Sequence, residues 1–323
     1  MGVGGTFGPH YKLPTVAIWN LTLERQVGAN WLFSLGYFAN AGYNLSSNAV
    51  GRGQINPAIY IPGQSTEANT QARRLNPDFS SVLQYPTDYV SRYESLQVNV
   101  EKRFGHGLSL LANYTFSKKE DDYGPAGQIT DPFDRRLDWG ISKDDVPHVF
   151  RFSGVWSIPR IGNHGLASTL VNGWELTGIT TWRSGFPFTV FSGVDNSFSG
   201  IGADRADFTG AKISDAVLTG QSTAKKLQQY FDTSLFVHNA VGTFGNAPKN
   251  ALRGPHFFNQ DFAAIRNFNV IEKASLQFRA EFFNAFNNVN FSNPGNTVGG
   301  GNFGQITSAG SPRIIQFALK LSF

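Results

Sequence analysis

ASLQFRAEFFNAFN, residues 274–287, is the stretch that decides the fold. Apolar side chains occupy every second position of its first half, and polar side chains such as Gln277, Arg279 and Glu281 stand between them. The last residues of the chain repeat the pattern, with apolar Phe317 and Leu319 beside polar Gln316 and Lys320. A period of two is typical of a β-strand with one apolar and one polar face.

The same alternation recurs along the chain and predicts nine strands. They are 15–25, 31–42, 89–104, 108–118, 147–158, 167–191, 257–270, 274–287 and 312–323. Strands of ordinary globular sheets have about 5–6 residues, whereas a tilted strand needs roughly 9–11 residues to cross a membrane. The predicted lengths therefore favour membrane-spanning strands. Residues 230–237 are a candidate for a tenth strand.

The connections between these strands alternate between short and long. Short ones are 26–30, 105–107, 159–165 and 271–273, and long ones are 43–88, 119–146, 192–256 and 288–311. Outer-membrane barrels have short periplasmic turns and long extracellular loops. We therefore expect an all-β fold, an antiparallel transmembrane β-barrel segment of about nine or ten long strands.

Charge assigns a side to each face of the predicted sheet. A Lys or Arg that faces lipid at the membrane midplane costs about 2–4 kcal/mol. The faces of Arg103, Arg151 and Arg279 should therefore line the lumen, and the rows that contain Phe104, Phe152 and Phe282 should contact lipid. Rings near strand ends would form aromatic girdles. They are Trp31, Tyr37, Tyr89, Tyr93, Trp156, Trp174 and Trp182.

Composition excludes several kinds of function. The 323 residues include no Cys, which excludes a disulfide framework, a thiolate metal site and a cysteine nucleophile. Lys and Arg are scattered, so nucleic acid is not an expected partner. The six His lack metal-ligand spacing, no run of apolar residues is long enough for a transmembrane helix, and the first residues do not resemble a signal peptide. We expect no catalytic residue, no metal and no cofactor, and hence no enzyme.

The long loop 119–146 is the candidate binding region, because binding residues concentrate on loops held by a rigid scaffold. Its acidic residues alternate with Lys and Arg, which predicts a solvated loop with internal ion pairs. A hydrolase that uses Asp134 and Asp138 is a weaker alternative. Seven residues are candidates for contact with a small ligand or glycan. They are Tyr123, Asp131, Phe133, Asp134, Arg135, Arg136 and Trp139.

Several separated segments resemble one protein family. The segments are INPAIYIPGQST at 55–66, YESLQVNVEKRFGHGLSLLANYTFSK at 93–118, DPFDRRLDWGISKDDVPHVFRFSGVW at 131–156, LRGPHFFNQDFAAIRNF at 252–268, and the ending 279–323. They resemble, in order, the C-terminal part of TonB-dependent outer-membrane receptors of the Oar-like, Acidobacteria-type kind. The resemblance implies a place in the bacterial outer membrane and a barrel of about 22 strands around an N-terminal plug.

The resemblance also implies partners. Phe317, Leu319, Leu321 and Phe323 match the C-terminal signal that the barrel-assembly machinery recognises. The other expected partners are outer-membrane lipid, an unknown ligand or glycan, and TonB only through an N-terminal part. Because the chain lacks a plug and has an odd number of strands, we expect residues 1–323 to form a single partial barrel domain.

The expected function is therefore to provide the barrel wall and extracellular loops of a TonB-dependent receptor, which recognises a substrate and takes it up across the outer membrane. A second hypothesis is a soluble or surface β-sandwich that binds carbohydrate, since a sandwich would show the same alternation.

Overall fold

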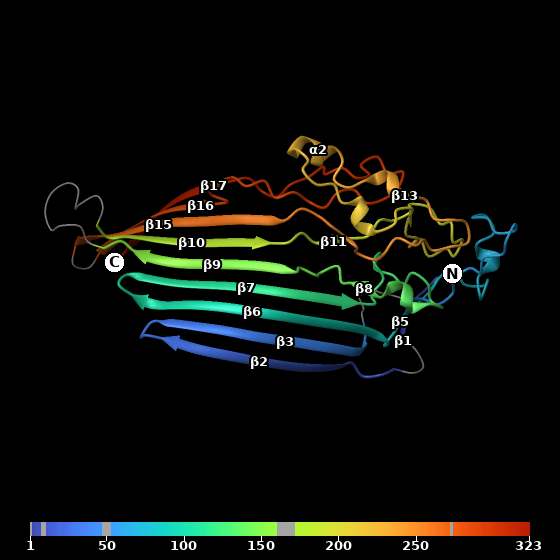
Figure 1. Cartoon of the computed structure of the whole chain (residues 1–323), viewed down its shortest axis with the longest axis horizontal. Helices are drawn as coiled ribbons and strands as arrows, with labels where there is room; N and C mark the ends of the chain where they lie inside the picture. The colour runs from blue at the N-terminus through green and yellow to red at the C-terminus, as the bar shows by residue number, and fades with distance from the viewer. Residues whose placement is uncertain (1, 8–10, 47–52, 160–171, 272–273) are drawn as a thin grey trace.

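The computed structural model describes residues 2–7, 11–46, 53–159, 172–271 and 274–323. Nine long strands form one antiparallel sheet, and the two-residue strand β8 (Gly140–Ile141) extends it beside β7. The long strands are β2 (Thr15–Val27), β3 (Trp31–Leu45), β6 (Tyr89–Gly105), β7 (Leu108–Asp121), β9 (His148–Ser157), β10 (Trp174–Arg183), β15 (Phe257–Ile271), β16 (Ala274–Phe283) and β17 (Ile314–Ser322). Their order in the sheet follows the chain, so each pairs with its neighbours in sequence (Figure 1).

The nine predicted strands correspond to these nine. The largest difference lies in the predicted strand 167–191, which ends as β10 at Arg183 and is followed by the separate short strand β11 (Pro187–Phe188). Residues 167–171 and most of the predicted turn 159–165 lie outside the described residues. In 230–237, only β13 (Phe236–Val237) is a strand, and it pairs with the equally short β12 (Asp207–Phe208). This segment therefore supplies no tenth long strand.

Strand register places the apolar residues of neighbouring strands side by side, because directly paired residues point to the same face. One row crosses seven strands and contains only apolar or aromatic residues. It runs Leu23, Leu35, Val98, Tyr114, Phe150, Trp182 and Phe258. The adjacent row is polar throughout. It runs Glu24, Ser34, Asn99, Asn113, Arg151, Thr181 and Asn259. The sheet thus has one apolar face and one polar face, as the sequence predicts.

The predicted aromatic girdle needs a correction. Trp182 belongs to the apolar row, and it lies near His148, which also contacts Phe116 and bonds the Tyr114 hydroxyl at 2.8 Å. Tyr89 and Tyr93, however, alternate in phase with Ser95 and therefore lie on the polar side. Tyr89 is also fully buried. Both rings therefore lie on the polar side of the sheet and are not part of a girdle.

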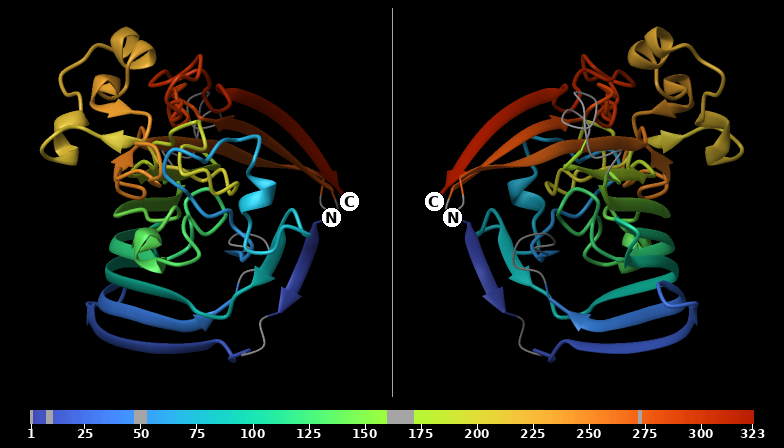
Figure 2. Two further views of the ribbon diagram at one scale, coloured as in Figure 1. Left: turned by 90° about the vertical axis from the view of Figure 1, so that its right-hand side faces the viewer. Right: turned by 90° about the vertical axis from the view of Figure 1, so that its left-hand side faces the viewer.

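The two outermost strands each have one partner among the described residues. β2 pairs with β3, and β17 pairs with β16. Figure 2 shows that the sheet curves through part of a circle. A separate small sheet joins β1 (Val3–Phe7), β5 (Val82–Tyr85) and β4 (Gly53–Gln54), and its β1–β5 pair is parallel. The main sheet therefore has two edges whose outer backbone groups face no strand within the described chain.

The long connections at one end of the sheet fold on their own core. This unit includes β11 to β13, the short helix α2 (Thr223–Gln228) and β14 (Leu252–Arg253). The Phe231 ring is nearly fully buried and lies 5.5 Å from those of Phe188 and Phe303 and 5.6 Å from that of Phe236. None of the helices in the described parts of the chain is long and apolar enough to cross a membrane.

The two rows yield a matched prediction. Val98→Arg places a cation on the apolar face, which the sequence predicts to contact lipid, and should destabilise the folded protein by about 2–4 kcal/mol in denaturant unfolding from vesicles. Asn99→Arg, one residue away on the polar face, should have much less effect. Equal losses for the two variants would contradict the assignment of the faces.

Candidate functional site

The segment after β7 is held to the sheet by main-chain pairing. Glu120 pairs with Ile141, and Asp121 pairs with Gly140, so β8 returns the loop to the strand that it left. Adjacent residues of β7 point to opposite faces. Asp121 is therefore on the side of the polar face, and Glu120 is on the side of the apolar face.

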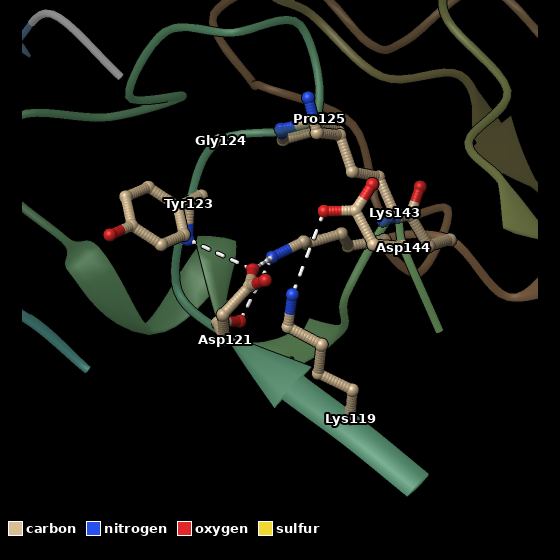
Figure 3. A pocket seen from close by; sticks show the side chains of 9 residues that line it. Lys119, Asp121, Tyr123, Gly124, Pro125, Lys143 and Asp144 are labelled. Carbon is tan, nitrogen blue, oxygen red and sulfur yellow. Dashed lines mark hydrogen bonds and ion pairs between the residues drawn. The ribbon is translucent and has the colours of Figure 1, made fainter. Parts of the chain in front are cut away.

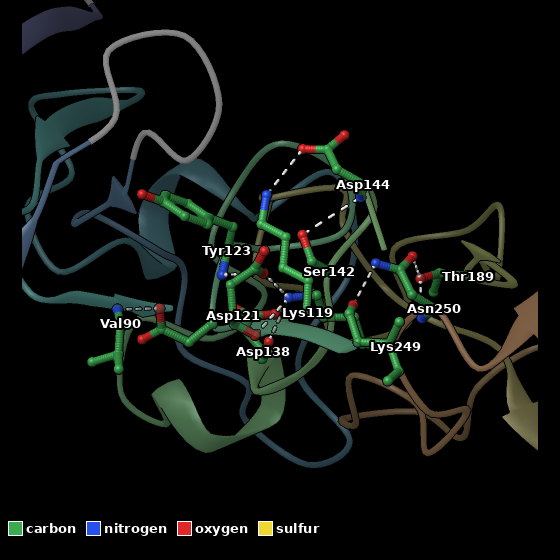
Figure 4. Close-up of polar contacts among 12 residues, drawn as sticks. Val90, Lys119, Asp121, Tyr123, Asp138, Ser142, Asp144, Thr189, Lys249 and Asn250 are labelled. Atoms are coloured by element: carbon green, nitrogen blue, oxygen red, sulfur yellow. Dashed lines mark hydrogen bonds and ion pairs between the residues drawn. The ribbon is translucent and has the colours of Figure 1, made fainter. Parts of the chain in front are cut away.

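A buried lysine from a distant loop joins this segment on the polar side. The Lys249 ammonium donates hydrogen bonds to Asp121 Oδ1 at 2.5 Å, to the Asp121 carbonyl at 2.9 Å and to the Asp138 carbonyl at 2.9 Å. The side chains of Lys249 and Asp121 are only 2% and 6% exposed. All three ammonium protons thus have an acceptor, which is what a buried charge requires (Figure 4).

The residues that follow Lys249 make further contacts with the same loop. The side-chain amide of Asn250 donates to the Ile141 carbonyl at 2.8 Å, and its main-chain N–H donates to the Thr189 hydroxyl at 2.8 Å. Arg253 forms an ion pair with the buried carboxylate of Asp145. We call residues 249–253 the staple segment, because these contacts hold the loop 119–146 against the unit with the Phe231 core.

Asp138 occupies the centre of this junction and is fully buried. Its carboxylate accepts hydrogen bonds from the Thr130 amide at 2.9 Å and the Thr130 hydroxyl at 2.5 Å. Burial raises the pKa of Asp138 above the usual range of a carboxyl, and the Thr130 bonds act in the opposite direction. Burial likewise lowers the pKa of Lys249, and the nearby Asp121 opposes this shift.

On the polar side, a pocket of about 240 Å³ opens beside this junction (Figure 3). We call it the inner pocket. It is lined by Lys119, Asp121, Tyr123, Gly124, Pro125, Lys143, Asp144, Lys249 and Asn250. Lys119 forms an ion pair with Asp144 at 3.6 Å. Lys143 is exposed and forms no ion pair with any described residue, so its ammonium is available to a ligand.

A second pocket, the outer pocket, lies on the other side of the same strand ends. It is lined by Val90, Arg92, Asp122, Arg135, Arg136 and Trp139. Arg92 pairs in register with Glu120 and so belongs to the apolar side. Its guanidinium lies over the Trp139 ring, 5.8 Å from the centroid.

The structure separates the seven predicted site residues. Tyr123 lines the inner pocket and stacks on Tyr89, with ring centroids 4.3 Å apart. Three others, Arg135, Arg136 and Trp139, line the outer pocket. The remaining three, Asp131, Phe133 and Asp134, line neither pocket. Asp131 accepts from the Phe133 amide, and Asp134 forms the N-cap of the short 3₁₀ helix Arg135–Asp138.

The expectation of internal ion pairs in the loop is confirmed, but the expectation of a solvated loop is wrong. Arg135 pairs with Asp122 at 3.2 Å, and Arg136 pairs with Asp134 at 2.8 Å. Asp121, Asp138 and Asp145 are nevertheless buried, because the staple segment covers them. Lys249, Asn250 and Arg253 are not among the residues predicted from the sequence, because no local pattern around them indicates that they are buried against a loop more than a hundred residues away.

Within the described residues, no group of three or more His, Cys, Asp or Glu side chains is arranged so that it could hold a metal ion.

Comparison with protein families gives a match over residues 2–316 to the model described as "Outer membrane beta barrel domain". The chain belongs to the outer membrane β-barrel family. Its place is therefore the outer membrane, and the apolar face of the sheet is the face that contacts lipid. The polar face that contains Arg151 accordingly faces the lumen.

Solved structures with a similar course of the chain are outer-membrane receptors and transporters. The ferripyoverdine receptor of Pseudomonas aeruginosa is 12% identical, with 95% of this chain and 27% of that chain covered and a TM-score of 0.46. The ferric preacinetobactin receptor BauA from Acinetobacter baumannii is 12% identical, with 95% and 29% covered and a TM-score of 0.46. The transporter YddB from Escherichia coli is 10% identical, with 99% and 34% covered and a TM-score of 0.46.

This chain thus spans between about a quarter and a third of the length of those structures. A search of curated proteins gave no match.

The staple segment generates a prediction about the loops of this barrel. Lys249→Met leaves the Asp121 carboxylate buried without its counter-charge, and removal of one partner of a buried pair costs about 3–5 kcal/mol. Hydrogen exchange should show a loss of protection in residues 119–123 and 138–142, while the rest of β7 and the other long strands stay protected.

Lys118→Met is the matched control, because Lys118 is exposed and its pair with Glu120 is worth at most about 1 kcal/mol. The double variant Lys249→Met with Asp121→Leu should recover part of the lost protection. Unchanged exchange in Lys249→Met would show that the buried pair does not hold the two loops together.

Proposed function

We propose that this chain forms part of the wall and extracellular loops of a TonB-dependent outer-membrane receptor of the Oar-like kind, which recognises a small ligand or glycan and takes it up. The observation that carries the proposal is the position of the inner pocket. It opens on the lumen side of the sheet, where the loop 119–146 meets the staple segment. A substrate bound there would lie at the mouth of the lumen.

The chemistry of the inner pocket supports a polar or anionic substrate. Lys143 supplies an ammonium that has no carboxylate partner among the described residues, and Tyr123 supplies a ring of the kind that stacks on flat groups or sugars. Of the seven residues predicted from sequence, we assign substrate contact to Tyr123. Contact by Asp131, Phe133 and Asp134 stays a prediction. No catalytic step is part of this proposal.

The edges of the sheet support a partial barrel. Each unpaired backbone group within lipid costs several kcal/mol, and β2 is exposed along its whole length. We infer that residues 1–323 form one partial barrel domain and that further strands of the same receptor pair with β2 and β17. Such a receptor would reach TonB through its N-terminal part.

The last strand supports a role for the barrel-assembly machinery. Phe317, Leu319 and Leu321 lie on the lipid-facing side of β17, in register with Ala280, Phe278 and Leu276. These three side chains and Phe323 are well exposed. An exposed apolar row at an edge strand is what a strand-pairing assembly factor can recognise.

The alternative of a carbohydrate-binding β-sandwich is not supported. A sandwich packs two sheets of similar size face to face, whereas the nine long strands described here form a single sheet.

Uptake by the bacterium that carries the gene tests the proposal. We expect the medium of the parent strain to lose at least one small molecule or glycan that a strain without the gene, and a strain without TonB, both leave behind. Mass spectrometry of spent medium is the measurement. If the two mutant strains deplete the medium as the parent does, the proposed transport is excluded.

A matched pair of variants then tests the inner pocket. Lys143→Gln should slow uptake of the identified compound several-fold, because a charge-assisted hydrogen bond to the substrate is lost. Lys118→Gln removes the same charge from the opposite face and should leave uptake unchanged. Equal effects of the two variants on uptake would show that the inner pocket does not recognise the substrate.

A further inference from the structure

The outer pocket lies on the lipid-facing side of the sheet, beyond its last apolar residues and toward the long loops. On β6, the apolar face ends at Leu96, and the next residues on that face are Glu94 and Arg92. On β7, it ends at Phe116 and continues with Lys118 and Glu120. Arg92 is about 13 Å along the strand from Leu96, at about 3.3 Å per residue. This places the pocket at the level of the lipid headgroups outside the barrel.

The guanidinium groups outnumber the acids in the lining of this pocket. Arg92, Arg135 and Arg136 face one acidic residue, Asp122. Three of the neighbouring acids form an ion pair with a cation, and Asp88 adds a further negative charge near Arg135. Asp122 pairs with Arg135, Asp134 pairs with Arg136, and Glu120 pairs with Lys118 at 2.7 Å, while Glu94 lies opposite Lys118 in register.

Arg92 is the exception among these cations, because no carboxylate of the described residues lies within ion-pair distance of it. Its neighbour is the ring of Trp139, which is 39% exposed. Arg136 is 91% exposed in its side chain, so its guanidinium can bond a further anion beside Asp134. Two accessible guanidiniums and an indole therefore border one pocket at the membrane surface.

We propose that the outer pocket binds the phosphate group of a lipid in the outer leaflet. Planar guanidiniums match the oxygen atoms of a phosphate with paired hydrogen bonds. An indole at the membrane–water interface packs its ring against the upper acyl chain or sugar of the same lipid. This inference depends on the outer-membrane location of the family and is independent of transport. It also gives Arg136 and Trp139, which the sequence marks as ligand contacts, a lipid ligand in place of a transported one.

Native mass spectrometry of the full-length protein, extracted from outer membranes into a neutral detergent, tests the proposal. The probes are bisphosphorylated lipid A and the same lipid after removal of both phosphates. We expect about tenfold tighter binding of the phosphorylated form, and a similar loss of that preference in the double variant Arg92→Gln with Arg136→Gln. Equal binding of the two lipids, or unchanged binding by the double variant, would overturn the site.

Two single variants keep the test decisive if the double variant does not fold. Arg136→Gln changes only an exposed side chain and should weaken binding by itself. Asp134→Asn releases Arg136 from its carboxylate while Asn can still cap the 3₁₀ helix, and it should strengthen binding. Arg25→Gln, on the lipid-facing side at the opposite end of the sheet, is the matched control and should have no effect.

Inorganic phosphate distinguishes the lipid from a soluble anion. We expect millimolar phosphate to leave lipid A bound, because the acyl chains and sugar add contacts that the free ion lacks. Displacement of lipid A by phosphate at the concentration at which phosphate itself binds would assign the pocket to a soluble anion and overturn the lipid assignment.

Discussion

Backbone hydrogen bonding in lipid is the constraint on which the rest of this structure depends. Water is absent from the hydrocarbon layer, so each N–H and C=O of a spanning strand must pair with a neighbouring strand. Pairing fixes register, and register fixes which side chains stand side by side. The same main-chain pairing produces both rows of side chains, the apolar row from Leu23 to Phe258 and the adjacent polar row from Glu24 to Asn259. A lipid face and a lumen face thus follow from one set of main-chain bonds.

Different physics holds the loops. They lie outside the lipid, where apolar burial can stabilise them, and the ring of Phe231 packs among three other rings. Charges are buried here as well, and at Lys249 all three ammonium protons have an acceptor. The loops therefore present a fixed surface on both sides of the strand ends. The inner pocket lies on the lumen-facing side of the sheet, and the outer pocket lies on its lipid-facing side.

The strands could be predicted from the sequence because a period of two is local and recurs nine times. The positions of Tyr89 and Tyr93 were also available, since both alternate in phase with the polar residue Ser95; proximity to a strand end alone was a misleading criterion. The staple segment could not be predicted. Lys249 and Asp121 are 128 residues apart, and a lysine in a loop is more often solvated than buried. Only the folded loops reveal which acids are covered.

The alternation of β7 restricts how this protein can change length. Asp121 and Asp122 are consecutive, yet the first faces the inner pocket and the second faces the outer pocket. One residue inserted in or removed from the strand would exchange the two sets of side chains, placing polar side chains such as Asn113 toward lipid and rings such as Tyr114 toward the lumen. A single residue can therefore be gained or lost only in the loops or where a β-bulge accommodates it, as between Asn269 and Ile271 of β15, and elsewhere the strands can lengthen or shorten only two residues at a time.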